Sequence, residues 1–399
     1  MHNITAERVA AVRTWLETNN LDAVIIPHED EYLGEYVPAH NERLHWLTGF
    51  TGSAGAAVIT RETAAIFVDG RYTVQVRKQV PAELFEYRHL IEEPALDWII
   101  NSLPQGSKVA FDPRMHTAAW LKGAQAKLAE KVELTTLSAN PIDELWSDRP
   151  EPVVSDVRLM ATDAVGQSSE SKRAEIAGLL KAKGADAAIL TELDSICWLL
   201  NIRGLDVSRL PVVLSNAIIH ADESVDFFLD PARIPAGFEA HVGNGIRVSH
   251  PSELEVRLQS LENRNVSVDS STSNAWYTLV LQNAGAHIIE AADPCLMPKA
   301  AKNATEIAGM KACHIRDGVA MAKFLSWIDA EVAQGNLHNE AVLADKVQSF
   351  REQDPTLSPP APGRGRSPSR PPPSRPPPSR PPPGRAFGSG PDPAAAAAA

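Results

Sequence analysis

The sequence predicts an α/β protein built from two tandem domains of similar fold, followed by a short helical region and a disordered tail. Three observations carry this prediction. Short apolar runs of strand character alternate with amphipathic helical patterns along most of the chain, which is typical of a sheet covered by helices. Two short sequence matches recur in the same order in two successive regions. The composition then changes abruptly near the C-terminus.

The first predicted domain spans residues 1–150. Apolar residues at three- and four-residue steps predict a helix over 5–19. The run AVIIP predicts a short buried strand at 23–27, and two apolar runs predict a hairpin. The strands of this hairpin are expected at 56–60 and 64–68. The further predictions are a strand at 108–112, a helix at 117–130, a strand at 132–137, a short helix from Asn140 through Trp146 and an extended linker at 148–154.

The second predicted domain spans residues 151–301 and repeats this alternation. Ser168 is a suitable N-cap for a helix that ends near Gly184. A strand at 187–191 follows it. Further predictions are strands at 212–220 and 225–230, a helix, a strand and a helix between 252 and 282, and a strand at 286–291.

The internal repeat rests on two short matches. LETNNLDAVII from Leu16 aligns with LKAKGADAAIL from Leu180, and WLTGFTG from Trp46 aligns with WLLNIRG from Trp198. Two matches in the same order favour duplicated domains. We therefore interpret Trp46 and Trp198 as core residues rather than ligand-stacking residues. Burial of such a side chain is worth roughly 3 kcal/mol or more, judged from truncation costs.

A third region, residues 302–357, predicts a long helix and then a second helix at about 338–351. Asn303 is a suitable N-cap, with Glu306 three residues on as in a capping box. His314 lies on a narrow apolar stripe, and we interpret it as a packed core histidine rather than a metal ligand. The stripe consists of Ile307, Met310, His314, Met321, Leu325, Ile328 and Val332.

Composition excludes several classes of protein. The formal charge of −12 argues against a nucleic-acid binder. No run of 18 apolar residues exists, so we expect no membrane span, and the N-terminus lacks the pattern of a signal peptide. Cys197, Cys295 and Cys313 lie far apart and form no zinc or disulfide framework. We therefore expect a cytoplasmic protein.

The chain contains few motifs that carry chemistry. TGSAG at 51–55 is not a nucleophile elbow, because Thr51 replaces the first glycine; its glycines are expected to allow a tight turn into the next strand. The acidic run 28–31 is expected to be a solvated loop rather than a metal site. Arg71 follows a predicted strand and an Asp-Gly turn. Its guanidinium could bind a substrate carbonyl or carboxylate, although an ordinary exposed arginine is the simpler interpretation.

Four segments resemble one family, the cytosolic three-domain Xaa-Pro aminopeptidases (aminopeptidase P). The segment from Asp30 to Val80, which contains VDGRY, resembles the N-terminal creatinase-like domain of that family. NPIDELWSDRPEPV resembles its inter-domain linker, and ELDSICWLLNIRGLDVSRLPVVLSNAIIH resembles its second creatinase-like domain. KNATEIAGMKACHIRDGVAMAKFLSWIDAE resembles the opening helix of its catalytic pita-bread domain. The resemblance runs almost continuously to about Leu357.

The resemblance implies a function and one site residue. Members of this metallopeptidase family release the N-terminal residue from peptides with proline in second position, using two manganese ions. Arg71, in the D-G-R-Y element, is implied to bind the peptide substrate. The family's five metal ligands have no counterpart before Leu357, so we expect no catalytic or metal-binding residue, no bound cofactor and no activity in this chain alone. We expect a homodimer formed through the N-terminal domains; a non-catalytic dimerisation or peptide-binding module is the alternative.

The tail, residues 358–399, differs from the rest of the chain. It contains six arginines and one acidic residue, so the total of −12 combines +5 for the tail with −17 for the remainder. Such a composition predicts disorder with polyproline II character. The SRPPP repeats give proline motifs such as Arg370–Pro376, which could bind a groove in a partner. A shifted reading frame in a GC-rich gene, truncating the catalytic domain, is the interpretation we favour.

Overall fold

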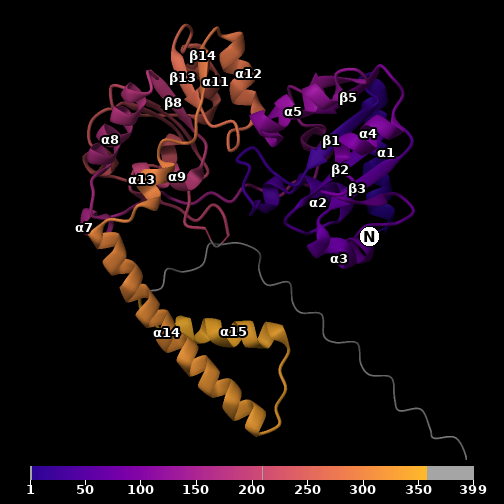
Figure 1. Ribbon diagram of the computed structural model, residues 1–399. Coiled ribbons are helices and arrows are strands. Elements are labelled where there is room, and N and C mark those ends of the chain that lie inside the picture. Colours follow the sequence, from indigo (N-terminus) through magenta and orange to yellow (C-terminus); the bar gives the residue numbers. More distant parts are fainter. Residues whose placement is uncertain (1, 209, 357–399) are drawn as a thin grey trace, which may run out of the picture. The chain divides into compact units, whose positions relative to one another are not determined.

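The structure is a computed structural model that describes residues 2–208 and 210–356 (Figure 1). The chain divides into two units, Met1–Gly363 and Arg364–Ala399. The second unit, with its proline motifs, lies outside the described residues. Within the first unit, two successive α/β domains precede a pair of helices.

The first domain contains a six-stranded mixed sheet in the order β4-β3-β2-β1-β5-β6. Strand β1 pairs antiparallel with β2 and parallel with β5. The strands are β1 (Ala23–Pro27), β2 (Gly55–Thr60), β3 (Ala64–Val68), β4 (Glu86–His89), β5 (Ser107–Phe111) and β6 (Val132–Thr136). The helices are α1 (His2–Thr18), α2 (Arg43–Thr48), α3 (Thr73–Gln79), α4 (Ala95–Ser102), α5 (Ala118–Leu128) and α6 (Pro141–Leu145).

Helices cover both faces of this sheet because its central strands are apolar on both sides. Val24 and Ile26 of β1 pack in one buried cluster with residues of α1 and α2. Ile25, which alternates with them along the strand, packs in a second cluster with residues of α4. A strand that is buried on both faces reads as a continuous apolar run, which explains why β1 could be predicted from AVIIP.

The second domain repeats the sheet of the first. Its strand order is β12-β11-β10-β8-β13-β14, and each pair has the same relative direction as its counterpart. The strands are β8 (Ala187–Leu190), β10 (Asn216–His220), β11 (Val225–Phe228), β12 (Ile246–Ser249), β13 (Asn265–Val268) and β14 (His287–Glu290), with β7 (Arg158–Leu159) and β9 (Ile202–Arg203) in a separate two-stranded sheet. The helices are α7 (Thr162–Val165), α8 (Ser169–Ala182), α9 (Leu193–Leu199), α10 (Phe238–Val242), α11 (Leu254–Gln259), α12 (Ala275–Asn283) and α13 (Leu296–Ala300).

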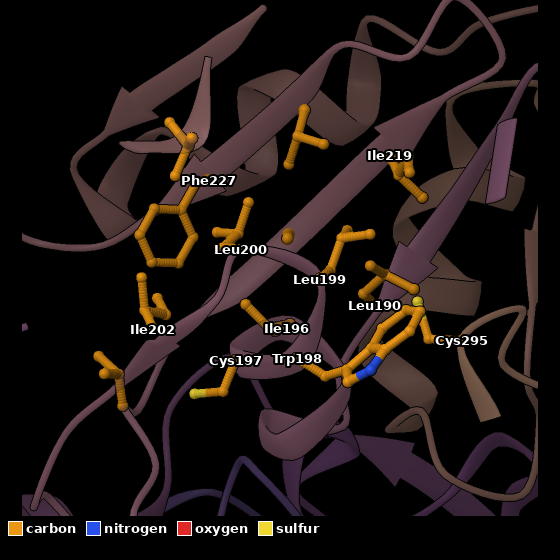
Figure 2. Packing of buried hydrophobic residues seen from close by; sticks show 14 of the residues in the cluster. Leu190, Ile196, Cys197, Trp198, Leu199, Leu200, Ile202, Ile219, Phe227 and Cys295 are labelled. Atoms are coloured by element: carbon orange, nitrogen blue, oxygen red, sulfur yellow. The ribbon is translucent and has the colours of Figure 1, made fainter. Parts of the chain in front are cut away.

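The duplicated-domain prediction is therefore confirmed, and so is the role of both tryptophans. Trp46 is 7% exposed and Trp198 is 6% exposed. Figure 2 shows Trp198 in the core of the second domain, among buried side chains that include Leu190 and Cys295. These residues are structural parts of their domains and are not accessible for stacking on a ligand.

The predicted strand over 212–220 is too long at its start, since β10 begins at Asn216. The reason is that a side chain binds a backbone N–H group of residues 212–215 that a strand would use for pairing. The carboxylate of Asp206 accepts a hydrogen bond of 2.8 Å from the backbone N–H of Leu214. A side chain that captures backbone donors in this way keeps a segment out of the sheet.

The last described region contains α14 (Ala304–Ala333) and α15 (Glu340–Arg351). The capping box of Asn303 and Glu306 is confirmed. The interpretation of His314 as a packed core residue is wrong, because its side chain is exposed. Ala320 is the one buried residue of α14 within the described part of the chain. Helix α15 packs against α14, and Met321 and Ile328 of the stripe are half-buried. The other apolar residues of the stripe are exposed.

Candidate functional site

The turn that follows β3 positions Arg71. Asp69 caps a short 3-10 helix, Gly70–Tyr72, by accepting a 2.8 Å hydrogen bond from the backbone N–H of Arg71. The Asp69 carboxylate also accepts from Nε of Arg71 at 3.0 Å and from Nη2 at 2.7 Å. One carboxylate thus fixes both the backbone and the side chain of the arginine.

The Arg71 side chain is held but remains open to a ligand. It is 62% exposed, and its Cζ lies 5.1 Å from the ring centroid of Tyr72. The hydrogen bond from Arg71 holds the pKa of Asp69 below its ordinary value, and the same contact raises the pKa of Arg71. The contacts with Asp69 use Nε and Nη2, so the two N–H groups of Nη1 are available to an incoming carbonyl or carboxylate.

Tyr72 ties this turn to the glycine-containing loop at 51–55. Its hydroxyl lies 2.9 Å from Oγ of Ser53, and its ring packs edge-to-face on Phe50 at 5.6 Å between centroids. A Cβ on Gly52 would lie 2.2 Å from the Phe50 ring. The glycine is therefore required by close packing under the Arg71 turn, which gives the TGSAG loop a supporting role.

The acidic run 28–31 differs from the expected solvated loop. Asp30 is buried and accepts a 2.9 Å hydrogen bond from Nδ2 of Asn41. Burial raises the pKa of Asp30 to about 6. Glu31 pairs with the buried Arg43 at 3.1 Å, and Arg43 also pairs with Asp143 at 2.7 Å. The expectation was wrong for Asp30, which is buried, and for Glu31, which is half-buried beside Arg43, while Glu29 is exposed.

The described residues do not fit a metal centre. In residues 2–208 and 210–356, no group of three or more His, Cys, Asp and Glu side chains is arranged to hold an ion. A dinuclear site needs several such ligands on a rigid frame. We therefore derive no step through a metal ion.

Comparison with known proteins defines the class of the two domains. Residues 8–145 and 148–306 each match a family model described as "Creatinase/Prolidase N-terminal domain". The chain thus contains two consecutive creatinase/prolidase N-terminal domains. Over most of its length it is also related to Xaa-Pro aminopeptidases.

Two curated relatives and one solved structure carry that relationship. Xaa-Pro aminopeptidase 1 of Dictyostelium discoideum is 31% identical over 364 residues, covering 87% of this chain and 57% of that protein. Xaa-Pro aminopeptidase ApepP of Drosophila melanogaster is 33% identical over 339 residues, covering 83% and 55%. The X-prolyl aminopeptidase of Caenorhabditis elegans, described as a cytosolic enzyme with a di-nuclear active site, superposes with a TM-score of 0.81 at 25% identity, covering 88% of this chain and 60% of that one. The chain thus spans little more than half the length of these relatives.

Among the described helices, none combines the length and the apolar character that crossing a bilayer requires.

Proposed function

We propose that the two creatinase-like domains form the substrate-positioning part of a Xaa-Pro aminopeptidase, a hydrolase that releases the N-terminal residue from peptides with proline in second position. The observation that carries this proposal is the similarity to the Caenorhabditis elegans X-prolyl aminopeptidase, which extends over 88% of this chain. We also propose the domain division 1–150, 151–301 and 302–357, with the third segment opening a catalytic domain, and a cytoplasmic location.

In this proposal Arg71 binds the peptide. Its guanidinium is held by Asp69, and its free Nη1 N–H groups would donate to a carbonyl or carboxylate oxygen of the substrate. A charge-assisted hydrogen bond of this kind contributes about 1.5–3 kcal/mol. The residue positions the peptide and does not generate a nucleophile.

We assign the hydrolysis of the peptide bond to none of the described residues. The family resemblance implies two manganese ions, which supply an activated hydroxide when they are bound, and the described side chains do not fit them. We therefore propose that residues 1–357 bind peptide without hydrolysing it. The alternative, a non-catalytic module that dimerises through its N-terminal domains or binds peptides for another purpose, is favoured by the same lack of a ligand group among the described residues.

The test measures binding and turnover separately. The full chain is titrated with a fluorescently labelled Ala-Pro peptide, and hydrolysis is followed with added manganese and with a chelator. We expect binding that weakens about tenfold or more in Arg71→Gln, and no metal-dependent turnover. Arg77→Gln is a matched control, because Arg77 is also exposed and its Cζ lies 5.4 Å from the ring centroid of Tyr87.

The outcomes separate the alternatives. Equal binding of a peptide with alanine in place of proline would favour the general peptide-binding module. Chelator-sensitive hydrolysis by the purified chain would contradict the assignment of the chemistry to other residues. Binding that Arg71→Gln and Arg77→Gln leave equally unchanged would remove Arg71 from the site.

A further inference from the structure

The second domain contains a polar hollow that the proposed peptidase function does not use. Its volume is about 670 Å³, within the range of roughly 300–1,000 Å³ that is typical of small-molecule sites. It lies where β8, β11 and β12 begin and where β10 ends. Its charged lining includes Asp226, His220, Arg247, Arg257 and Arg264.

Asp226 occupies a position that is apolar in the first domain. In the second sheet, Ile218 of β10 lies between Ile189 of β8 and Asp226 of β11. In the first sheet, the equivalent register places Val58 of β2 between Ile25 of β1 and Ala65 of β3. The fold therefore does not require a charged residue at the position of Asp226, since the equivalent residue of the first domain is Ala65.

The carboxylate of Asp226 is buried among cations. Its side chain is 8% exposed, and Oδ2 lies 2.9 Å from Nε2 of His220. Nε of Arg257 lies 3.6 Å away, and Nη1 of Arg247 lies 3.5 Å from Oδ1. Burial alone would raise the pKa of Asp226, but the His220 hydrogen bond and the two guanidinium charges hold it below its ordinary value. Asp226 thus hydrogen-bonds to His220 and lies close to the guanidinium groups of Arg247 and Arg257.

The three arginines retain most of their hydrogen-bonding capacity. Their contacts with carboxylates lie at 3.5 Å for Arg247, 3.6 Å for Arg257 and 3.9 Å for Arg264 with Asp186. A hydrogen bond from nitrogen to oxygen spans about 2.7–3.2 Å, and a guanidinium carries five donors. The side chains of Arg247 and Arg264 are 60% and 63% exposed, so these donors can reach a ligand from solvent.

The hollow also contains two further acidic residues, which hydrogen-bond to local donors rather than to the arginines. Asp222 accepts hydrogen bonds from the hydroxyl and the backbone N–H of Ser224, at 2.6 and 3.0 Å. Asp186 accepts a hydrogen bond of 2.8 Å from the backbone N–H of Asn265. Both carboxylates are therefore occupied by local backbone or hydroxyl donors.

We propose that this hollow binds the phosphate group of a small molecule through Arg247, Arg257 and Arg264, and that the negative charge of Asp226 weakens this binding. The two oxygens of a carboxylate match the fork of one guanidinium. A phosphate offers oxygens in several directions and can accept from guanidinium groups on different elements, as β12, α11 and the segment before β13 provide here. The volume exceeds that of a phosphate group, so the ligand carries a larger moiety.

Inorganic phosphate is the first probe, applied to the full chain by calorimetric titration at constant ionic strength, with chloride and acetate as comparison anions. We expect phosphate to bind, and the double variant Arg247→Gln/Arg264→Gln to weaken it about tenfold or more. Arg158→Gln is the matched control, because Arg158 is exposed in β7 and lies outside the hollow. The arginines of residues 358–399 are the same in all these proteins, so binding to them does not change between variants.

Asp226→Asn supplies a readout that a purely structural ion-pair network would not give. Removing this negative charge should tighten phosphate binding, because the anion then meets the same cations with less repulsion. A circular-dichroism melt establishes that the variant is folded. Equal binding in the wild type and the Arg247/Arg264 variant, or acetate binding as tightly as phosphate, would overturn the proposal. If Asp226→Asn does not fold, the double variant alone decides.

Discussion

Lys172 donates a 2.9 Å hydrogen bond to the carbonyl oxygen of Trp198, and its ammonium nitrogen lies 4.4 Å from the centroid of the Trp198 ring. Arg8 stands in the same relationship to Trp46 in the first domain, since it donates to the Trp46 carbonyl and its Cζ lies 4.6 Å from that ring. The alignment that reveals the internal repeat also pairs Arg8 with Lys172. A cation therefore joins α1 to the core tryptophan of the first domain, and another joins α8 to the core tryptophan of the second.

The contact between Lys172 and Trp198 should stabilise the second domain. Lys172→Ala should lower the free energy of unfolding by about 2–4 kcal/mol, because it removes buried methylene groups and leaves the carbonyl of Trp198 and the side-chain oxygen of Asn201 without their donor. Urea unfolding followed by tryptophan fluorescence measures the change. Lys181→Ala, an exposed position on the same helix α8, should stay within about 0.5 kcal/mol. An equal decrease in the free energy of unfolding for the two variants would contradict a stabilising role of the Lys172–Trp198 contact.

Arg71 is expected to matter for the substrate and not for the fold. Because its side chain is 62% exposed, Arg71→Gln should change the free energy of unfolding by no more than about 0.5 kcal/mol. In a chimera that adds the catalytic domain of a relative, the same change should lower kcat/KM for a Xaa-Pro peptide by about tenfold to a hundredfold. Steady-state kinetics measures this. A large loss of folding stability would instead give Arg71 a structural role.

His116 predicts a loss of stability in acid. Its Nε2 is buried without a hydrogen-bond partner, and its ring stacks on Trp120 at 3.9 Å between centroids. Burial lowers the pKa of His116 from 6.5 to about 3. In that interval the unfolded chain binds the proton and the folded chain does not, so stability falls as pH decreases from 6.5 towards 3, by up to about 1.4 kcal/mol per pH unit.

The comparison that isolates this effect is His116→Phe, which keeps an aromatic ring beside Trp120 and cannot be protonated. Urea midpoints between pH 7 and pH 4 should fall less steeply for this variant than for the wild type. His287→Phe changes an exposed histidine and should leave the wild-type slope nearly intact. Parallel curves for the wild type and His116→Phe would show that His116 does not control the response to acid.

We expect proteases to cut the region of α14 and α15 before they cut the two α/β domains. Most apolar side chains of α14 are exposed, including Ile315 at 71% and Val332 at 62%. Few buried contacts mean a low cost of local opening, so limited trypsin digestion should remove the region after about Lys302 and leave a compact fragment. Mass spectrometry of the time course identifies the cuts. Full protection of residues 303–350 would mean that a partner or another part of the chain covers the exposed face.

The sequence predicted those elements whose signals are local. The apolar strands β1, β2 and β3, the cap of α8 and the capping box of α14 all follow from short patterns. Strand β4 and helix α4 were not predicted. Strand β4, Glu86–His89, is a polar edge strand with no buried residue, so it lacks the alternation from which strands are recognised.

The site was harder to predict because burial depends on residues that are distant in sequence. Asp30 looks like part of an exposed acidic run, yet it is buried and accepts a hydrogen bond from Asn41, eleven residues further along the chain. His314 lies on an apolar stripe, yet that stripe is exposed. Asp226 lies in the run VDFFLD, which predicts a strand, so the sequence could have indicated a charged residue inside that strand. The position of Arg71 after a strand and a turn drew attention to it, but only the family resemblance implied a role in substrate binding, which the kinetic experiment tests.

The pairing of the central strands also bears on how the chain folds during its synthesis. Ala23 of β1 pairs with Val109 of β5, and β5 then pairs with β6, which ends at Thr136. The first sheet cannot close until that strand has left the ribosome, and the second cannot close until β14 has followed, because parallel pairing of distant segments must wait for both partners. Closure of the first sheet can therefore begin before the second domain has emerged, which limits the time during which unpaired strands of the two copies are exposed together and could exchange.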